Sequence, residues 1–226
     1  MSIPTIRLAV DAVVFGYDPK EGISILLIKR KYDPFKGGWA IPGGLVLENE
    51  SLETAVEREL EEETGVKVDY LEQLYTFGEL NRDPRNRVVA VAYYGLVKMS
   101  DFHLYASTDA EDAKWFHWNE LPELAFDHAQ ILKVAIDRLR GKIRYEPIGF
   151  ELLDNKFPFS ELHKLYESLM GIEVDRRNFK KKFLQLNILT ELDEKISEGK
   201  GRPGSLFKFD KTKYLKKKKE GFIFDV

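Results

Sequence analysis

Cysteine is absent from the 226 residues, which excludes disulfides, thiolate metal sites and cysteine nucleophiles. Long hydrophobic runs are also missing, since no apolar stretch approaches the roughly 20 residues that span a bilayer. The apolar segment near the start contains Arg7 and Asp11 and lacks a small-residue cleavage site, so it is not a signal peptide. We therefore expect a soluble, cytoplasmic protein without a membrane partner.

Charge is unevenly distributed along the chain, although the net charge is only −3. Residues 151–226 carry 17 Lys and Arg against 13 Asp and Glu, whereas residues 1–150 carry 18 against 25. Such an asymmetry predicts two units with different partners.

The first unit, residues 1–145, has the pattern of a mixed α/β domain. Val- and Ile-rich stretches predict strands over 6–17, 22–31, 73–80, 87–97 and 113–118, and a short strand between the glycines of 37–44. A helix is predicted from a Ser51 cap to Thr64 with Gly65 as its stop, and an amphipathic helix over 127–142.

The first of these helices carries an unusual concentration of acid. Glu59, Glu62 and Glu63 lie three and four residues apart, so they share one helical face and repel one another. The repulsion becomes favourable around a hard divalent cation with oxygen ligands, above all Mg²⁺. A solvated acidic face is the simpler interpretation, but the spacing of the surrounding residues argues against it.

That spacing fills every fixed position of the pattern G-x5-E-x7-R-E-U-x-E-E-x-G-U, in which U is aliphatic. The matching residues are Gly44, Glu50, Arg58, Glu59, Leu60, Glu62, Glu63, Gly65 and Val66. The pattern is the Nudix box, and with "WAIPGG" before it, residues 1–145 resemble a Nudix hydrolase domain.

The resemblance implies hydrolysis of a nucleoside diphosphate linked to another group, with Mg²⁺ or Mn²⁺ bound. By position, Glu59 and Glu63 would be the main metal ligands, with Glu62 in the same shell and backbone near Gly44 contributing. Arg58 would hold Glu50 and so lock the loop against the helix. The general base varies in this family and stays unassigned.

A second cluster, "NRDPRNR", places Arg82, Arg85 and Arg87 around the turn at 83–84. It is either a charged surface turn or a phosphate clamp beside the metal, since arginine matches phosphate bidentately. Similar arginine-bearing loops in relatives that recognise ADP-ribose favour substrate binding. His128, near a helix start, either contacts ligand or is solvated, and we expect it to be solvated.

Residues 150–226 have a different pattern: helix, turn, helix and hairpin, the order of a winged helix-turn-helix. Ser160 is expected to cap the first helix and Asp175 the second, with Phe179, Phe183 and Leu186 facing inward. Basic residues on the outer face of the second helix and on the following glycine loop predict contacts to double-stranded DNA: Arg176, Arg177, Lys180, Lys181, Lys200 and Arg202.

Taken together, the chain resembles the Nudix-related transcriptional regulators, one branch of which senses ADP-ribose in NAD metabolism while another controls sugar use. This resemblance implies an α+β chain: a Nudix α/β/α sandwich with a mixed sheet, then a small winged-helix domain. It also implies a nucleotide-type ligand, and a homodimer is expected on DNA. Many such regulators carry a degraded box, whereas this one is complete. Two alternatives stay open: a metabolic pyrophosphatase whose C-terminal domain does not bind DNA, and a sugar sensor with a vestigial metal site.

Overall fold

A computed structural model describes residues 5–102, 104, 110–197, 203–222 and 224. The chain forms two compact units, Met1–Arg138 and Leu139–Val226, so the division falls within one helix. The predicted domain limits of 145 and 150 stay predictions.

The first unit is built on a seven-stranded mixed sheet. Its strands are β1 (Arg7–Asp18), β2 (Gly22–Arg30), β3 (Trp39–Ala40), β4 (Gly43–Leu45), β5 (Tyr70–Phe77), β6 (Val88–Lys98) and β7 (Ala110–His117). β1 and β6 pair in parallel along their length, and the other pairs are antiparallel. The mixed sheet is therefore confirmed, although β5 lies at 70–77 rather than the predicted 73–80.

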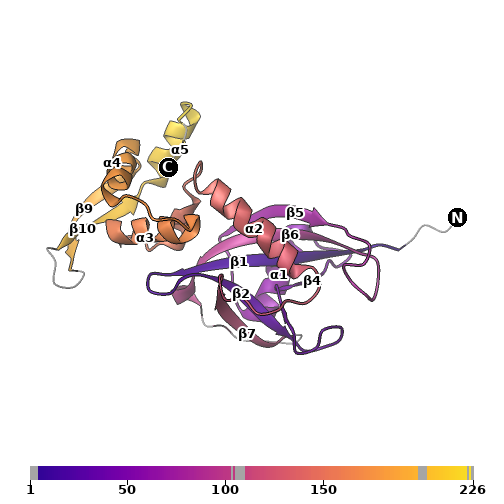
Figure 1. Cartoon of the computed structure of the whole chain (residues 1–226). Coiled ribbons are helices and arrows are strands. Elements are labelled where there is room, and N and C mark those ends of the chain that lie inside the picture. The colour runs from indigo at the N-terminus through magenta and orange to yellow at the C-terminus, as the bar shows by residue number, and fades with distance from the viewer. Residues whose placement is uncertain (1–4, 103, 105–109, 198–202, 223, 225–226) are drawn as a thin grey trace. The chain divides into compact units, whose positions relative to one another are not determined.

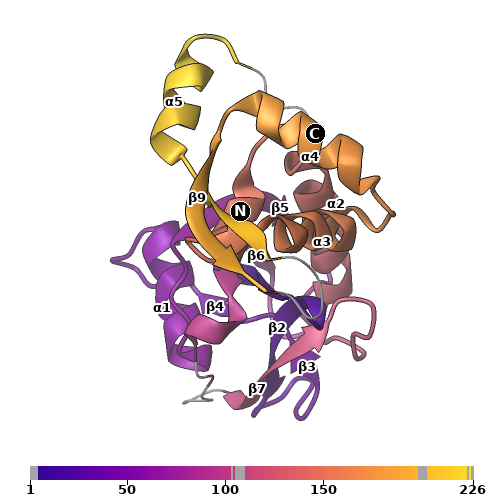
Figure 2. The ribbon, with the colours of Figure 1, turned by 90° about the vertical axis from the view of Figure 1, so that its left-hand side faces the viewer.

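Helices α1 (Leu52–Thr64) and α2 (His128–Lys142) cover opposite faces of this sheet, as Figures 1 and 2 show. Alternate β1 residues, Val10, Ala12 and Val14, join the core cluster that packs against α1. Residues of the opposite parity, including Asp11, therefore face the α2 side. The layers form the predicted α/β/α sandwich.

β1 changes partners along its length, and this change creates the site. Its second half pairs with β2, while Val10 and Asp11 lie opposite Gly44 and Gly43 of β4. The β4 glycines are thereby held between β1 and α1. A short 3-10 helix, η1 (Met99–Asp101), follows β6.

The second unit begins in the last turn of α2 and continues through η2 (Ile148–Leu152), β8 (Phe157–Pro158), α3 (Phe159–Met170), α4 (Arg176–Leu186), β9 (Leu189–Ile196), β10 (Gly204–Phe209) and α5 (Lys211–Lys219). Its sheet has the order β8-β10-β9. Buried aromatic side chains form much of the core, among them Phe157, Tyr166, Phe183 and Phe207. The predicted order of helix, turn, helix and hairpin is present.

Three details of this unit differ from the prediction. Ser160 does not cap α3: the helix begins at Phe159, directly after β8 pairs with β10, so Ser160 already lies inside its first turn. Leu186 is only half-buried. Helix α5 was not predicted, because its lysine run has no apolar period.

Candidate functional site

The loop before α1 is locked by Arg58. The Arg58 guanidinium donates two hydrogen bonds to the carboxylate of Glu50, of 2.7 and 2.9 Å, and Glu50 also accepts from the Leu47 backbone N–H at 2.7 Å. Together, Arg58 first and then the Leu47 amide lower the pKa of Glu50 to about 2. The same guanidinium reaches Glu59 at 2.9 Å and Glu62 at 3.3 Å. Arg58 thus offsets the repulsion among the helix carboxylates.

Two adjacent glycines fit against the remaining carboxylates. The Gly43 N–H donates to Glu63 at 2.9 Å, and Glu63 is buried on the sheet side of α1. A methyl group at Gly44 would lie 2.3 Å from a Glu59 oxygen, so only glycine leaves room for that carboxylate. At Gly43 the clash would be with the Val10 backbone oxygen, at 2.2 Å. The glycine pair therefore places both carboxylates against one backbone segment.

A cavity of about 370 Å³ opens beside these carboxylates. Its lining combines the acidic groups of α1, the β4 glycines and several cationic or aromatic side chains: Arg7, Arg30, Tyr32, Asp33, Gly43, Gly44, Leu45, Leu47, Glu59, Glu63, Asp83, Arg85, Asn86 and Val88. Carboxylates for a cation and guanidinium groups for an anion thus share one cavity.

A buried ion network adjoins this cavity. Arg82 donates to both carboxylate oxygens of Asp127, at 2.7 and 2.9 Å, and to Asp11 at 3.1 Å. Its side chain is only 6% exposed. A recess of about 90 Å³ shares Gly43, Gly44 and Arg85 with the cavity and reaches Arg82 and Asp11. The network ties the arginine loop to β1 and to the start of α2.

His128 belongs to the same layer and is not solvated, contrary to the prediction. It is 5% exposed, and its Nδ1 accepts a hydrogen bond from the Ile41 N–H at 2.9 Å. Burial lowers the pKa of His128. Because Nδ1 accepts from a backbone N–H, it carries no proton, and this hydrogen bond holds the segment between β3 and β4.

Comparison with known proteins agrees with this geometry. Residues 5–138, more than half of the chain, match the NUDIX domain. The chain belongs to the Nudix family. Residues 149–209 match the NrtR DNA-binding winged helix domain, so both units of the expected architecture are accounted for.

Two curated relatives have different functions. The ADPR responsive transcriptional repressor NtrR of Acinetobacter baylyi is 32% identical over 210 residues, 91% of this chain and 83% of that protein. An ADP-ribose pyrophosphatase of Methanocaldococcus jannaschii is 40% identical over 135 residues, 60% of this chain and 74% of that protein.

Solved structures of Shewanella oneidensis NrtR resemble both parts of the chain. NrtR complexed with a 27mer DNA has a TM-score of 0.75 and 34% identity, covering 89% of this chain and 93% of that one. Its NUDIX domain complexed with ADP ribose has a TM-score of 0.56 and 37% identity, covering 61% and 90%.

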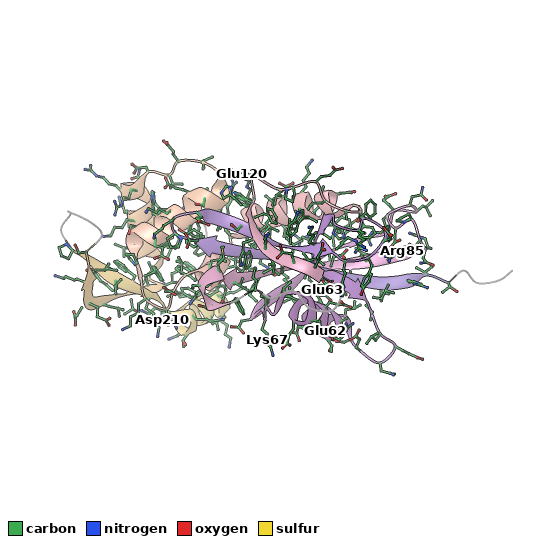
Figure 3. The ribbon with its side chains drawn as sticks, turned by 90° about the horizontal axis from the view of Figure 1, so that it is seen from below. Glu62, Glu63, Lys67, Arg85, Glu120 and Asp210 are labelled. Carbon is green, nitrogen blue, oxygen red and sulfur yellow. The ribbon has the colours of Figure 1, made fainter. Side chains whose placement is uncertain are left out.

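The Nudix box residues differ in their environment. Glu59 and Glu63 line the cavity. Glu62, which precedes Glu63 on α1, has a side chain that is 53% exposed (Figure 3). In the described part of the chain, no three acidic or histidine side chains already form a metal cluster. The site nevertheless fits a divalent cation, because its donors are oxygens and Gly44 leaves room for the Glu59 carboxylate.

The three predicted arginines also diverge. Arg85 lines the cavity, with its guanidinium held by both oxygens of Asp83 at 2.7 and 3.0 Å. Arg87 donates instead to the carbonyl oxygens of Glu79 and Val88. Arg82 is occupied by its two carboxylates, as described above. Of the trio, only Arg85 combines exposure with a place in the cavity lining.

The cavity residues that the sequence analysis missed include two arginines and a tyrosine. Arg7 is the first residue of β1, Arg30 is the last residue of β2, and Tyr32 lies in the loop between β2 and β3. Arg30 is oriented by the Pro34 carbonyl, to which its Nε donates at 2.8 Å. An arginine at the end of an apolar strand was the sequence feature that could have indicated them. Nothing in the local sequence, however, indicates that these strand ends lie next to the Nudix box residues.

The winged-helix unit presents a basic surface on α4. Asp175 caps the helix by accepting from the Asn178 N–H at 2.8 Å, and Phe179 and Phe183 are buried. The predicted Arg176, Arg177, Lys180 and Lys181 are all exposed. Among the described residues, no carboxylate pairs with Arg176, Arg177 or Lys181. Lys200 and Arg202 lie outside the described residues.

None of the helices within the described ranges combines the length and the apolar character that crossing a bilayer demands.

Proposed function

We propose that this protein is an ADP-ribose-responsive transcriptional repressor that also hydrolyses its ligand. The observation that carries the proposal is the cavity that combines Glu59 and Glu63 with Arg85, in a chain whose α4 exposes Arg176, Arg177 and Lys181 without a carboxylate partner among the described residues. The similarity to the Acinetobacter repressor across 91% of this chain supports the combination.

The cavity chemistry suits a diphosphate. Arg85, Arg7 and Arg30 provide guanidinium groups, which bind phosphate oxygens bidentately. Glu59 and Glu63, with the backbone near Gly44, would hold Mg²⁺ or Mn²⁺. When bound, the metal neutralises the diphosphate and makes a water molecule nucleophilic. Arg58 and Glu50 position these ligands by fixing the loop, and Arg82 fixes the loop that carries Arg85.

Hydrolysis follows from the complete set of box carboxylates and is supported by the 40% identity to an ADP-ribose pyrophosphatase. With Mg²⁺, the purified protein should cleave ADP-ribose. Glu63→Gln should lose nearly all activity, because it removes a metal-binding charge while its amide oxygen can still accept from Gly43. Glu62→Gln, the same change at the exposed neighbouring position, should lose much less.

The hydrolysis assay has a clear negative result. Wild-type protein that leaves ADP-ribose and a broad panel of nucleotide-diphosphate compounds intact, with either metal, would exclude the enzymatic part of the proposal. Equal losses in the two glutamine variants would instead place Glu62 among the main ligands.

DNA binding is assigned to α4, whose N-terminal turn would enter the major groove. One winged module offers a small interface, so we expect a homodimer on a near-palindromic site. A duplex DNA partner also fits the expected cytoplasmic location. Arg177→Ala should weaken specific binding by about 1–3 kcal/mol if it reaches a base edge. Lys133→Ala, an exposed lysine on α2, is the matched control and should have no effect.

A metabolic pyrophosphatase is the second candidate, favoured by the intact box. It predicts hydrolysis without a preferred DNA sequence. Selection from genomic fragments separates the two functions: recovery of one sequence family supports the repressor, and recovery of none supports the metabolic enzyme.

A further inference from the structure

Helix α5 lies just beyond the part of the chain that matches the NrtR winged helix domain, which ends at residue 209. Six of its nine residues are lysine, and none is acidic. Neither the Nudix site nor the α4 surface uses it. Its charge therefore has no role in the function described so far.

The helix is held in a fixed orientation. Asp210 caps its start by accepting from the Lys213 N–H at 2.8 Å. Tyr214 is 8% exposed, with its ring 6.0 Å from that of Phe209 in β10. With 3.6 residues per turn, Lys216 and Lys219 point away from the side that Tyr214 buries. Both are exposed. The outer face of α5 is thus a fixed cationic surface and not a loose tail.

Part of the lysine charge is neutralised within the unit. Lys211 lies 3.4 Å from Glu151, Lys213 3.7 Å from Asp210 and Lys218 4.0 Å from Glu146. For Lys216 and Lys219, no carboxylate partner occurs in the ranges that the structure covers. Lys217 also lacks a carboxylate partner in those ranges, but its ammonium lies 5.3 Å from the centre of the Phe222 ring. Lys216 and Lys219 are therefore the lysines that both face outward and keep an uncompensated charge among the described residues.

We propose that the outer face of α5, Lys216 and Lys219, is a second DNA-contacting surface that binds the phosphate backbone irrespective of sequence. α4 and α5 lie toward the same end of the C-terminal unit (Figures 1 and 2). Each of the two helices thus carries cationic side chains without a carboxylate partner among the described residues, Arg176, Arg177 and Lys181 on α4 and Lys216 and Lys219 on α5. Cationic groups spread over two helices match the repeating phosphates of a duplex better than one acidic patch on a protein. The inference rests on the proposed DNA-binding function and adds to it a contact outside the recognition helix.

The test is the salt dependence of DNA affinity. Each lysine that leaves a phosphate should reduce the slope of log K against log salt by about 0.9, so Lys216→Gln/Lys219→Gln should reduce it by about 1.8 per bound chain. Between 50 and 200 mM KCl, wild-type affinity should therefore fall about twelvefold more than that of the variant. The same change should appear on the preferred sequence and on unrelated duplex DNA.

Two further variants serve as controls. Lys20→Gln/Lys133→Gln removes the same charge from exposed positions of the Nudix unit and should keep the wild-type slope. Lys216→Arg/Lys219→Arg keeps the charge on α5 and should also keep it. ADP-ribose hydrolysis should be unchanged in all three.

Other outcomes assign the failure. If the wild type binds DNA and the α5 glutamine variant has the same slope of log K against log salt, this inference is wrong and the proposed function is unaffected. An equal reduction in the Lys20/Lys133 variant also overturns it, because the effect would be one of net charge. A wild-type protein without DNA affinity overturns the proposed function as well. If the α5 glutamine variant binds DNA as the wild type does but no longer binds an acidic protein that the wild type captures, α5 is a protein-binding surface and this inference is wrong.

Discussion

Arg82 and Arg85 are three residues apart in one loop, yet the structure gives them opposite environments. Arg82 is 6% exposed and lies between two carboxylates whose side chains are 9% and 14% exposed, Asp11 and Asp127. Arg85 is 51% exposed and pairs with Asp83. The matched substitutions Arg82→Ala and Arg85→Ala should therefore separate stability from ligand binding.

Removing Arg82 leaves two buried carboxylates without their cation. Breaking a buried ion pair by deleting one partner costs about 3–5 kcal/mol of unfolding free energy. The Arg85–Asp83 pair is half-exposed on its arginine side, although the Asp83 carboxylate is buried. Because Asp83 keeps its hydrogen bond from the backbone N–H of residue 85 in the variant, Arg85→Ala should cost clearly less stability than Arg82→Ala, which leaves two carboxylates without their cation. Because charged hydrogen bonds contribute about 1.5–3 kcal/mol, Arg85→Ala should instead weaken ADP-ribose binding by roughly ten- to a hundredfold.

Tryptophan fluorescence during urea unfolding measures the first effect. The three tryptophans, Trp39, Trp115 and Trp118, all lie in the Nudix unit, so the signal reports that unit alone. Calorimetric titration with ADP-ribose measures the second. Wild-type stability in Arg82→Ala, or an equal loss of stability in both variants, would refute the assignment of Arg82 to structure and Arg85 to ligand.

Three other predictions follow from the site. Gly44→Ala should displace the Glu59 carboxylate and weaken Mg²⁺ binding, measured by metal titration, by about 10–100-fold with little loss of stability. Gly43→Ala places its methyl group against backbone and should lower the free energy of unfolding, measured in urea, by about 1–3 kcal/mol. Wild-type stability in Gly43→Ala would contradict this geometry. Because the folded-state pKa of Glu50 is about 2 against an ordinary 4.5, its stabilising contribution should be present above pH 4.5 and be lost as pH falls toward 2, and Glu50→Gln should flatten that part of the stability profile. Because burial lowers the pKa of His128 below 6.5, its protonation in the unfolded state should reduce the unfolding free energy as pH falls below 6.5, and His128→Asn should abolish that dependence in the same measurement.

Local spacing predicted the residues of the box and their helix. Ser51 and Gly65 bound α1 as expected, because a side-chain cap and a left-handed glycine are local features. The hydrogen-bonded pair of Arg58 and Glu50 was expected from the resemblance to the Nudix family, and it spans only eight positions. Helix α4 and its Asp175 cap were predicted from local sequence in the same way.

Contacts between distant segments could not be anticipated. Arg82 meets Asp11 and Asp127 across 71 and 45 positions, and Ile41 meets His128 across 87. An arginine-rich turn looks the same in sequence whether its side chains face phosphate or buried carboxylates. β5 was misplaced by three residues because its side chains are mostly half-buried or exposed, which weakens the alternation that indicates a strand.

In the proposed function, one ligand controls DNA binding and is destroyed by the same protein. A ligand that binds one state of the repressor more tightly than the other must weaken DNA binding by the factor by which DNA weakens ligand binding, typically about 5–150-fold. DNA occupancy followed over time after one dose of ADP-ribose, with Mg²⁺ present, tests this directly. Occupancy of the wild type should fall and then recover as ligand is hydrolysed, while in Glu63→Gln, provided the variant still binds ligand, it should fall and stay low. Occupancy that stays constant in the wild type while ADP-ribose is consumed would contradict the claim and leave two independent activities on one chain.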